Sequence, residues 1–342
     1  MSKVRLQDVA SKAGVSVATV SNVLNNRKGV SKEVAEKILR LCEEMGYVPA
    51  SAEPQLKKSI RLVVTKKHGL VVINTQFFTE LIEGIEAECR NHHIDLMITH
   101  LQITDTAETE QLIESICTED CLGIILLATE LCEKDLKLFT KTRSPLVVLD
   151  NTGEHLNLNT VVIDNYEAGY LAGKMLIEKG HKRIGHITSA PGFPNMAERK
   201  NGFFRALHES GSVCPEEDRI ALTPTIEGAF RDMDRWLSEN RSPEFTAVFA
   251  ANDILALGAV QAFSKHGIRV PEDISVIGMD DLSFCQIARP NLSTIHVPRR
   301  QLGKAAVLRL IQIAEHPGET QYERHCVGVR PVNRESVKSL SL

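Results

Sequence analysis

From residue 60 onward, short apolar segments alternate with amphipathic ones, and this alternation constrains the fold more than any other feature. Apolar residues at helical spacing predict helices over residues 78–91, 166–179 and 253–266. The predicted strands cover residues 61–65, 70–73, 96–99, 124–128, 146–150, 161–164, 183–188, 247–250 and 275–278. Strands that alternate with helices form parallel sheets with helices on both faces. Because one sheet of this length would be unusually large, we predict two doubly wound α/β lobes.

The N-terminal residues have a different pattern, that of short helices without strands. Apolar spacing predicts a helix over Leu6–Ala13, and Gly14 ends it. A second helix over Val17–Leu24 follows Ser16, a residue type that caps helix N-termini. A third helix is predicted over Lys32–Met45. Two short helices joined by a glycine-containing turn are typical of the helix-turn-helix motif, whose second helix enters the major groove of DNA.

Small and polar side chains lie on the expected outer face of the second helix, where they can approach phosphates and base edges: Ser16, Thr19, Ser21, Asn22 and Asn25. Asparagine suits adenine, and short apolar side chains such as Val17 and Ala18 suit a thymine methyl group. Basic residues near this face, among them Arg5, can contact phosphates. The alternative is a three-helix bundle without a role in DNA binding. Charge favours the DNA-binding interpretation, because residues 1–61 carry a net +5 and the remainder −9.

Several protein classes are disfavoured by what the sequence lacks. No apolar run approaches the roughly 18 residues of a membrane span, and we see no secretory signal. We therefore expect a cytoplasmic protein without membrane contact, with its eight cysteines reduced. Nucleotide-binding glycine motifs, nucleophile motifs and histidine pairs at metal-ligand spacing are missing, so we predict no cofactor, metal site or catalytic residue. His92, His93 and His181 are interpreted as exposed loop residues.

The head of the chain resembles that of the lactose/galactose-repressor (LacI/GalR) family of transcriptional regulators. The matching motifs are VRLQDVA at residues 4–10, GVS at 14–16, TVS at 19–21, VLN at 23–25, VS at 30–31 and GYVP at 46–49. The resemblance covers nearly all of residues 4–49. It implies that Val17, Ala18 and Asn22 choose the operator bases and that Ser31 belongs to the DNA-binding face. Position 22 is often arginine in this family, so a less common operator half-site is expected.

A linker over residues 50–60 follows the head. Family members have a short hinge helix here, with a leucine that wedges into the minor groove, and Leu56 occupies that position. This sequence departs from the family because Ala50 replaces the usual asparagine and Pro54 lies inside the segment. Proline is tolerated only in the first turn of a helix, so a hinge helix here would be shorter and begin near Pro54. A plain flexible linker is the alternative.

The body resembles the core of the same family, which is similar to periplasmic sugar-binding proteins. The clearest motifs are DNYEAG at residues 164–169, GHKRI at 180–184, AND at 251–253 and PEDISVIGMDD at 271–281. The resemblance implies a ligand-binding and dimerisation core over residues 61–342, in which the chain crosses three times between two lobes. The first lobe would hold about residues 61–163 and 292–324, and the second about residues 164–291 and 325–342. The stretch TKKHG at 65–69 departs from the family and is interpreted as an inserted basic hairpin.

Ligands of open parallel sheets bind at the carboxyl ends of the strands. The resemblance carries the family's ligand positions onto Phe77, Phe78, Asp150, Arg199, Asn252 and Asp280. Carboxylates, a guanidinium and an amide can satisfy vicinal hydroxyls, and an aromatic face can pack on a sugar ring, so we expect a neutral carbohydrate. Arg199 could instead hold a carboxylate or phosphate in a bidentate pair.

Each of these residues also has a plainer interpretation. Asn252 or Asp253 can cap the following helix, and Asp281 can cap a short turn. The two phenylalanines can belong to the hydrophobic core. An arginine such as Arg199 is usually a solvated surface residue.

These features together predict a homodimeric repressor of carbohydrate-utilisation genes that binds double-stranded operator DNA, with an affinity set by a small ligand, a sugar. The helix near residues 299–315 would lie in the dimer-facing first lobe. An enzyme is disfavoured because Asp280 and Asp281, as strand neighbours, would point to opposite faces. A solute-binding transport protein would require a secretory signal. A regulator that senses a non-sugar metabolite or a partner protein stays open.

Overall fold

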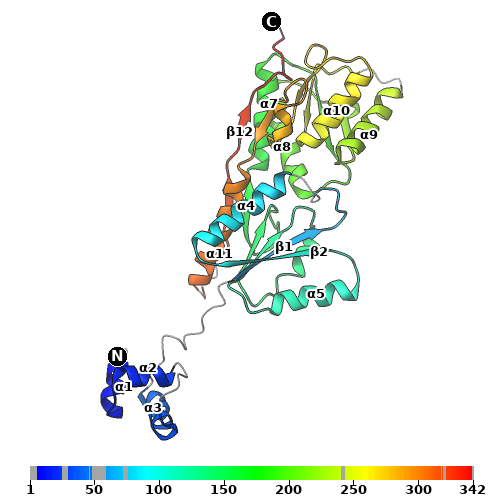
Figure 1. The fold of residues 1–342 in the computed structure, drawn as a ribbon. Helices are drawn as coiled ribbons and strands as arrows, with labels where there is room; N and C mark the ends of the chain where they lie inside the picture. Colours follow the sequence, from blue (N-terminus) through cyan, green and yellow to red (C-terminus); the bar gives the residue numbers. More distant parts are fainter. Residues whose placement is uncertain are drawn as a thin grey trace. The chain divides into compact units, whose positions relative to one another are not determined.

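The computed structural model describes residues 6–24, 30–45, 47, 59–71, 76–239, 243–316, 318 and 321–340. The chain divides into two compact units, Met1–Lys57 and Lys58–Leu342 (Figure 1). We call these the head and the core. None of the described helices is both long enough and apolar enough to cross a membrane.

The described part of the head consists of helices α1 (Leu6–Ala13), α2 (Val17–Leu24) and α3 (Lys32–Met45), with the predicted bounds. The helices bury one small apolar cluster: Val9, Ala10, Ala13, Val20, Ile38 and Cys42. Gly14 ends α1 with a φ of +72°, a conformation that favours glycine. The Lys37 ammonium of α3 then donates to the carbonyl oxygen of Ala13 at 3.2 Å, which fixes α3 against the turn.

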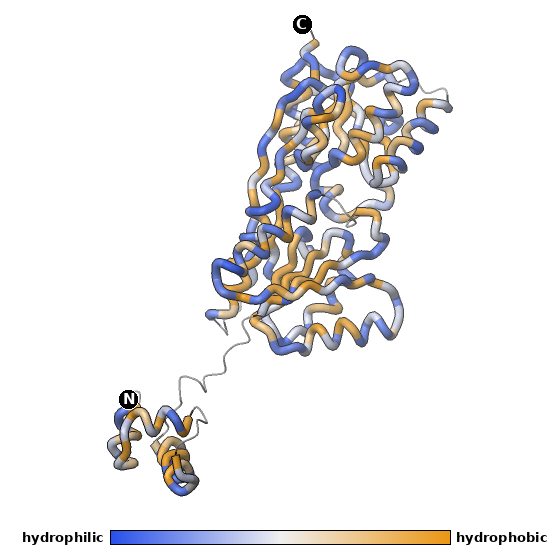
Figure 2. The backbone as a smooth tube through the Cα atoms, viewed as in Figure 1, coloured by the Kyte–Doolittle hydropathy of each residue, from blue (hydrophilic) through white to orange (hydrophobic). Residues whose placement is uncertain are grey.

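The first lobe contains a parallel sheet with the strand order β11-β5-β4-β3-β1-β2 in the described part of the chain. The strands are β1 (Ser59–Lys66), β2 (Asp95–Gln102), β3 (Gly123–Leu127), β4 (Leu146–Leu149), β5 (Asn159–Ile163) and β11 (Arg324–Val327). Helices cover both faces: α4 (Gln76–Asn91), α5 (Ala107–Thr118), α6 (Glu133–Lys137) and α11 (Arg299–Glu315). Figure 2 shows the apolar strands between these more polar helices.

Alternation along the strands explains why both faces of this sheet are covered. Leu62 and Val64 of β1 pack in the same cluster as residues of α4 and α11, whereas Val63 packs in a second cluster with residues of α5 and α6. Successive side chains of a strand point to opposite faces, so a strand that is apolar at every position must be buried on both.

The second lobe contains a smaller parallel sheet with the order β7-β6-β8-β9 among the described residues. Its strands are β6 (Ile184–Ser189), β7 (Arg219–Leu222), β8 (Ala247–Ala250) and β9 (Ser275–Ile277). Its helices are α7 (Asn165–Glu178), α8 (Pro194–Ser210), α9 (Ile226–Ser238) and α10 (Asp253–Lys265), with short 3-10 helices at Glu216–Asp218 and Ser283–Gln286. The doubly wound α/β fold predicted from the alternating pattern is therefore present in both lobes.

The described chain passes from one lobe to the other after β5, through β10 (Thr294–His296), and between β11 and β12 (Arg330–Val332). Strands β10 and β12 pair antiparallel beside these crossings. All of β11 pairs with β5 in the first sheet, so the first lobe extends to residue 327, close to the approximate boundary expected at residue 324. The strands β7, β10, β11 and β12 were not predicted, because a basic residue or histidine interrupts the apolar pattern in each of them.

Two other expectations fail in the core. Residues 65–69 form no hairpin: β1 continues to Lys66, and the following backbone N–H groups donate to the Glu130 carboxylate instead of a second strand. The predicted strand at 70–73 is a bend at residues 70 and 71, and the rest lies outside the described residues. His181 is buried rather than exposed, because the C-terminal segment covers it and the Lys338 carbonyl lies 3.3 Å from its Nε2. His92 and His93 are exposed.

Helices α7 and α8 approach each other through glycines. A Cβ atom on Gly169 of α7 would overlap the carbonyl oxygen of Arg199 in α8, and one on Gly202 of α8 would overlap that of Tyr166. Because both obstacles are backbone atoms, they cannot rotate away. This contact fixes the position of α8 and of the residues that it carries.

We predict that Gly169→Ala lowers the free energy of unfolding by about 2–3 kcal/mol, because overpacking forces the two helices apart. Chemical denaturation followed by circular dichroism measures this change. Gly192→Ala is the matched control, since its nearest contact would be the Ser189 carbonyl at 3.8 Å. Equal stability of the two variants would contradict the close approach.

His186 of β6 lies fully buried in an aromatic cluster. Its ring stacks on Phe203 at a centroid distance of 5.4 Å and lies 5.7 Å from Phe249. Its Nε2 atom has no hydrogen-bond partner among the residues that the structure describes. Burial, with smaller contributions from Lys200 and Arg219, lowers the pKa of His186 to about 3.

The folded protein therefore keeps His186 neutral, whereas the unfolded chain protonates it below pH 6.5. Its contribution to stability is complete above pH 6.5 and is lost as the pH falls towards 3, at about 1.4 kcal/mol per pH unit. We predict that His186→Phe removes this part of the pH dependence. Urea unfolding of both proteins between pH 5 and 8 tests it, and parallel profiles would contradict the assignment.

Candidate functional site

The N-terminus of α2 presents the predicted DNA-binding side chains. Ser16 caps the helix: its Oγ accepts the N–H of Thr19 at 3.1 Å and lies 2.8 Å from the Thr19 hydroxyl. Val20 is buried, which turns the opposite side of the helix outward. Ser16, Val17 and Ala18 are exposed, and Thr19, Ser21 and Asn22 are half-buried. A capped helix that exposes small side chains at its N-terminal end has the shape that fits a major groove.

The other predicted DNA contacts lie elsewhere. Ser31 is exposed directly before α3, where its carbonyl oxygen accepts the N–H of Ala35 at 3.0 Å. Arg5, Asn25 and Leu56 lie outside the described residues, as does the Pro54-containing linker.

The core contains a pocket between its lobes, which we call the interlobe pocket. The space between its lining atoms is about 460 Å³, including the part that is open to solvent. All six ligand positions implied by the family resemblance line it. The full lining is Val71, Phe77, Phe78, Thr129, Asp150, Phe193, Arg199, Pro224, Asn252, Ile254, Asp280 and Leu282. Residues from both lobes therefore face the same cavity.

Asp150 follows β4 with a positive φ of 61°, so the chain turns sharply at the end of the strand. Its Oδ2 accepts the Thr129 hydroxyl at 2.6 Å, and its Oδ1 accepts the Asn195 amide at 2.9 Å. Burial raises the pKa of Asp150, although these two hydrogen bonds and the charge of Arg199 oppose the rise. The side chain is thus a desolvated, oriented acceptor.

Arg199 of α8 is buried, contrary to the surface alternative. Its Nε donates to Asn165 Oδ1 at 2.8 Å, and its Nη1 donates to the carbonyl oxygen of Ala251 at 2.6 Å. These bonds fix the guanidinium at the pocket wall and engage two of its nitrogens. They occupy Nε and Nη1 of the guanidinium, so a ligand would be met by its Nη2 end.

Asp280 follows β9 and has a φ of +118°. It is 7% exposed, and within the described part of the protein its Oδ1 is a buried acceptor without a hydrogen-bond partner. Burial raises the pKa of Asp280, and the neighbouring Asp253 and Asp150 add to the rise against the charges of Arg199 and Arg299. An oriented, unpaired carboxylate oxygen in a cavity is the group that a ligand donor would satisfy.

Asn252 both caps a helix and lines the interlobe pocket, so its two proposed roles are compatible. Its Oδ1 caps α10 by accepting the Leu255 N–H at 2.9 Å, and the residue also lines the interlobe pocket. Asp253 is not the cap; its carboxylate accepts the Thr294 hydroxyl at 2.6 Å and the Leu282 N–H at 3.0 Å. Asp281 caps no turn and instead lies 2.8 Å from His296 Nδ1.

The aromatic residues are both buried and pocket-lining, so their two interpretations do not exclude each other. Phe77 and Phe78 of α4 meet edge to face with centroids 5.0 Å apart. Phe193, at the start of α8, was not predicted, and neither was Thr129. Thr129 comes just after β3, as Asp150 comes just after β4, so the strand-end rule would have identified it. Nothing in the local sequence marks Phe193.

Arg299 of α11 connects the pocket to the first lobe. Its guanidinium donates to the carbonyl oxygens of Asp280 and Asp281, and it pairs with Glu80 of α4 at 3.0 Å. Gln76 of α4 also accepts the N–H of Ser283 at 2.7 Å. The two helices of the first lobe thus contact the segment that carries Asp280.

Comparison with known proteins agrees with this organisation. Residues 5–50 match the family model of bacterial regulatory proteins, lacI family, and residues 174–337 match a periplasmic binding protein-like domain. The HTH-type transcriptional repressor PurR of Haemophilus influenzae (strain PittEE) is 32% identical, over 98% of this chain and 99% of its own. The ribose operon repressor of Haemophilus influenzae (strain ATCC 51907 / DSM 11121 / KW20 / Rd) is 33% identical, over 98% and 99%.

Solved structures show the same fold. A transcriptional regulator CelR–cellobiose complex has a TM-score of 0.73 at 25% identity and covers 97% of this chain and 99% of its own. A LacI family regulator from Enterococcus faecium with bound ribose has a TM-score of 0.68 at 25% identity and covers 83% and 100%. The chain therefore belongs to the lacI family of bacterial regulatory proteins and is a DNA-binding transcriptional repressor rather than an enzyme.

Proposed function

We propose that this repressor controls carbohydrate-utilisation genes and that a neutral sugar in the interlobe pocket sets its affinity for operator DNA. The observation that carries the proposal is the composition of the pocket. It combines buried, oriented carboxylates at Asp150 and Asp280 with phenylalanine rings. Carboxylates accept hydrogen bonds from hydroxyl groups, and aromatic faces pack on the apolar face of a sugar ring.

The charges at the pocket favour a neutral ligand over an anion. In their ionised forms, Asp150 and Asp280 would repel a phosphate or carboxylate, and the facing Arg199 already donates through Nε and Nη1 to protein oxygens. Complexes of similar regulators support a sugar as well, because one holds cellobiose and another ribose. The similarity to a ribose operon repressor points in the same direction.

We further propose that the protein acts in the cytoplasm as a homodimer. A dimer lets two helix-turn-helix heads read the two half-sites of a near-palindromic operator. Leu308 on α11 is exposed, as expected if this helix lies at a dimer face. A ligand that bridges the lobes would shift their relative position, and the chain crossings would transmit this shift towards the linkers. Such coupling between two sites is typically worth about 1–3 kcal/mol.

A thermal-shift screen tests the effector directly. The full-length protein is heated with sugars, sugar phosphates, purines and amino acids, because a ligand of the native state raises the melting temperature in a concentration-dependent way. A neutral sugar supports the proposal. A response to only phosphorylated or carboxylated compounds would contradict the neutral ligand, and a response to only purines or amino acids would favour a non-sugar metabolite.

We predict that Asp280→Asn weakens sugar binding by about 10–100-fold, because it replaces a charged acceptor in the pocket. Operator binding without ligand should be unchanged. Burial raises the pKa of Asp280, so its ionised form destabilises the empty fold as the pH rises. The variant should therefore melt at or above the wild-type temperature at pH 8, which excludes misfolding. Calorimetric titration measures the affinity, and an unchanged value would contradict the role of Asp280.

We predict that Asn22→Ala relaxes base preference by about 1–3 kcal/mol at one position of each half-site. Its effect on non-specific binding should be small, since phosphate contacts carry that affinity. Selection from a random DNA library with the wild type first supplies the operator. Both proteins are then titrated on this operator and on random DNA at several salt concentrations. An equal loss on both DNAs would refute a base-reading role.

A further inference from the structure

The backbone of residues 67–71 wraps around a single buried carboxylate. Oε2 of Glu130 accepts the N–H groups of Lys67 at 2.8 Å, His68 at 3.1 Å and Gly69 at 3.0 Å. Its Oε1 accepts the N–H of Val71 at 3.0 Å. We call residues 67–71 the Glu130-bound loop. It includes part of the basic stretch that departs from the family pattern.

The side chain of Glu130 is fully buried, so its charge depends on this loop. Burial tends to raise the pKa of Glu130, but the N–H groups of Gly69, Lys67 and Val71 outweigh it, and the pKa is lowered. His68 adds to this effect, with its Nδ1 3.5 Å from Oε1. Backbone N–H groups that converge on one carboxylate stabilise its ionised form and, in return, hold the loop in one conformation.

Further contacts fix the same loop. The Lys67 ammonium pairs with Asp135 at 2.6 Å, and the Gln102 amide donates to the Lys67 carbonyl at 2.8 Å. Gly69 has a φ of +71°, which lets the chain turn around the carboxylate. The conformation of the Glu130-bound loop therefore depends on its hydrogen bonds to Glu130.

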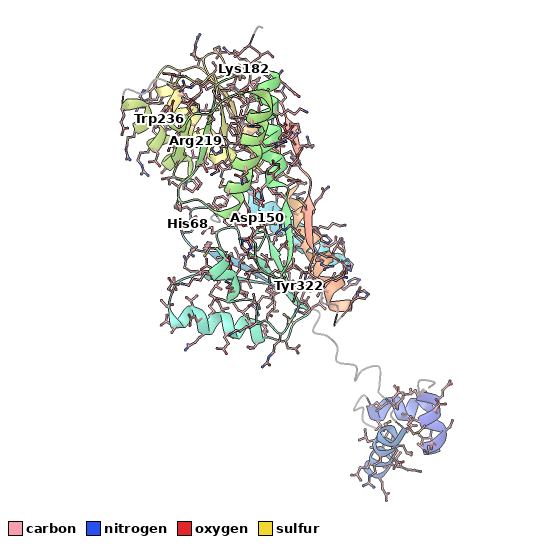
Figure 3. All side chains as sticks on the ribbon, turned by 180° about the vertical axis from the view of Figure 1, so that it is seen from behind. His68, Asp150, Lys182, Arg219, Trp236 and Tyr322 are labelled. Carbon is pink, nitrogen blue, oxygen red and sulfur yellow. The ribbon has the colours of Figure 1, made fainter. Side chains whose placement is uncertain are left out.

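The last residue of the loop reaches the ligand site. Val71 lines the interlobe pocket and packs against a cluster of the second lobe formed by Phe193, Met196 and Ala251. His68 and Asp150 both lie at the level where the lobes face each other (Figure 3). A segment of the first lobe thus forms a wall that spans to the second lobe, and Glu130 determines where that wall stands.

We propose that Glu130 is a positioning residue for ligand selectivity: it fixes Val71 as a pocket wall, and this wall limits the size of the sugar that the pocket accepts. The proposal rests on the sugar-binding function proposed above. Thr129, next to Glu130 in the chain, donates to Asp150 in the same pocket. Residues 129 and 130 therefore orient the Asp150 carboxylate and hold Val71 in place.

The test uses Glu130→Gln in the full-length protein. An amide in this position directs an NH₂ group at backbone donors, so at least one of the four hydrogen bonds is lost. Hydrogen exchange is followed by mass spectrometry in peptides covering residues 66–71. Affinities for ribose, glucose and cellobiose are measured by calorimetry. Glu133→Gln is the matched control, because Glu133 lies nearby on α6 with a partly exposed side chain.

We expect the loop amides of Glu130→Gln to exchange at least about tenfold faster than those of the wild type. The ratio of its affinities for a monosaccharide and for cellobiose should fall by about tenfold, because a displaced wall admits the larger sugar. Operator binding without ligand should not change. Val71→Ala provides a second variant in case Glu130→Gln does not fold. It should reduce the same preference while loop exchange stays at the wild-type rate.

Unchanged exchange in Glu130→Gln would overturn the proposal, since the loop would not depend on this carboxylate. Faster exchange with an unchanged sugar preference would overturn it too, because the wall would not affect selectivity. A wild-type protein that responds to no sugar in the thermal-shift screen would instead refute the proposed sugar response, and the selectivity role with it. That outcome is visible before any variant is compared.

Discussion

The parallel direction of the strands is the constraint on which the pocket depends. In each lobe's sheet the described strands run the same way, so their carboxyl ends share one edge. Asp150 follows β4 in the first lobe, and Asn252 and Asp280 follow β8 and β9 in the second. The chain crossings hold these two edges towards each other. Residues that end the strands therefore line the pocket from both lobes, and helices α4 and α8 add Phe77, Phe78 and Arg199.

Backbone conformation at the strand ends turns this edge into a specific site. Asp150 and Asp280 both have positive φ, which L residues rarely adopt and which the surrounding contacts must hold in place. Arg299 supplies such a contact by binding the carbonyl oxygens of Asp280 and Asp281. Arg299 belongs to α11 of the first lobe. A movement of Asp280 would therefore displace a hydrogen-bond partner of this helix. Pocket geometry and lobe position are therefore linked by the same hydrogen bonds.

The sequence predicts features whose causes are local. The helices of the head end where expected, because Gly14 and Ser16 terminate and cap them through neighbouring residues. The parallel α/β pattern is also correct, since it follows from apolar periodicity along each strand. The six predicted ligand positions lie around one cavity, although their role in binding a ligand remains our proposal.

Features that depend on distant partners could not be predicted from local pattern. The conformation of residues 67–71 is set by Glu130, some sixty residues later in the chain. His181 is buried because residues near the C-terminus cover it. Asp253 reads locally as a helix cap, yet its carboxylate binds Thr294 beside a crossing strand. In each case a contact with a residue far along the chain determines the structure, and the local sequence does not reveal that contact.

The cap formed by Asn252 has a chemical consequence for the ligand. Its oxygen accepts the Leu255 N–H, so the NH₂ group remains for the pocket. Arg199 likewise can only donate, whereas ionised Asp150 can only accept. The pocket thus presents both hydrogen-bond donors and acceptors, among them the Asp280 carboxylate. A hydroxyl group meets both demands from a single atom, whereas a ketone or ether oxygen can answer only the donors.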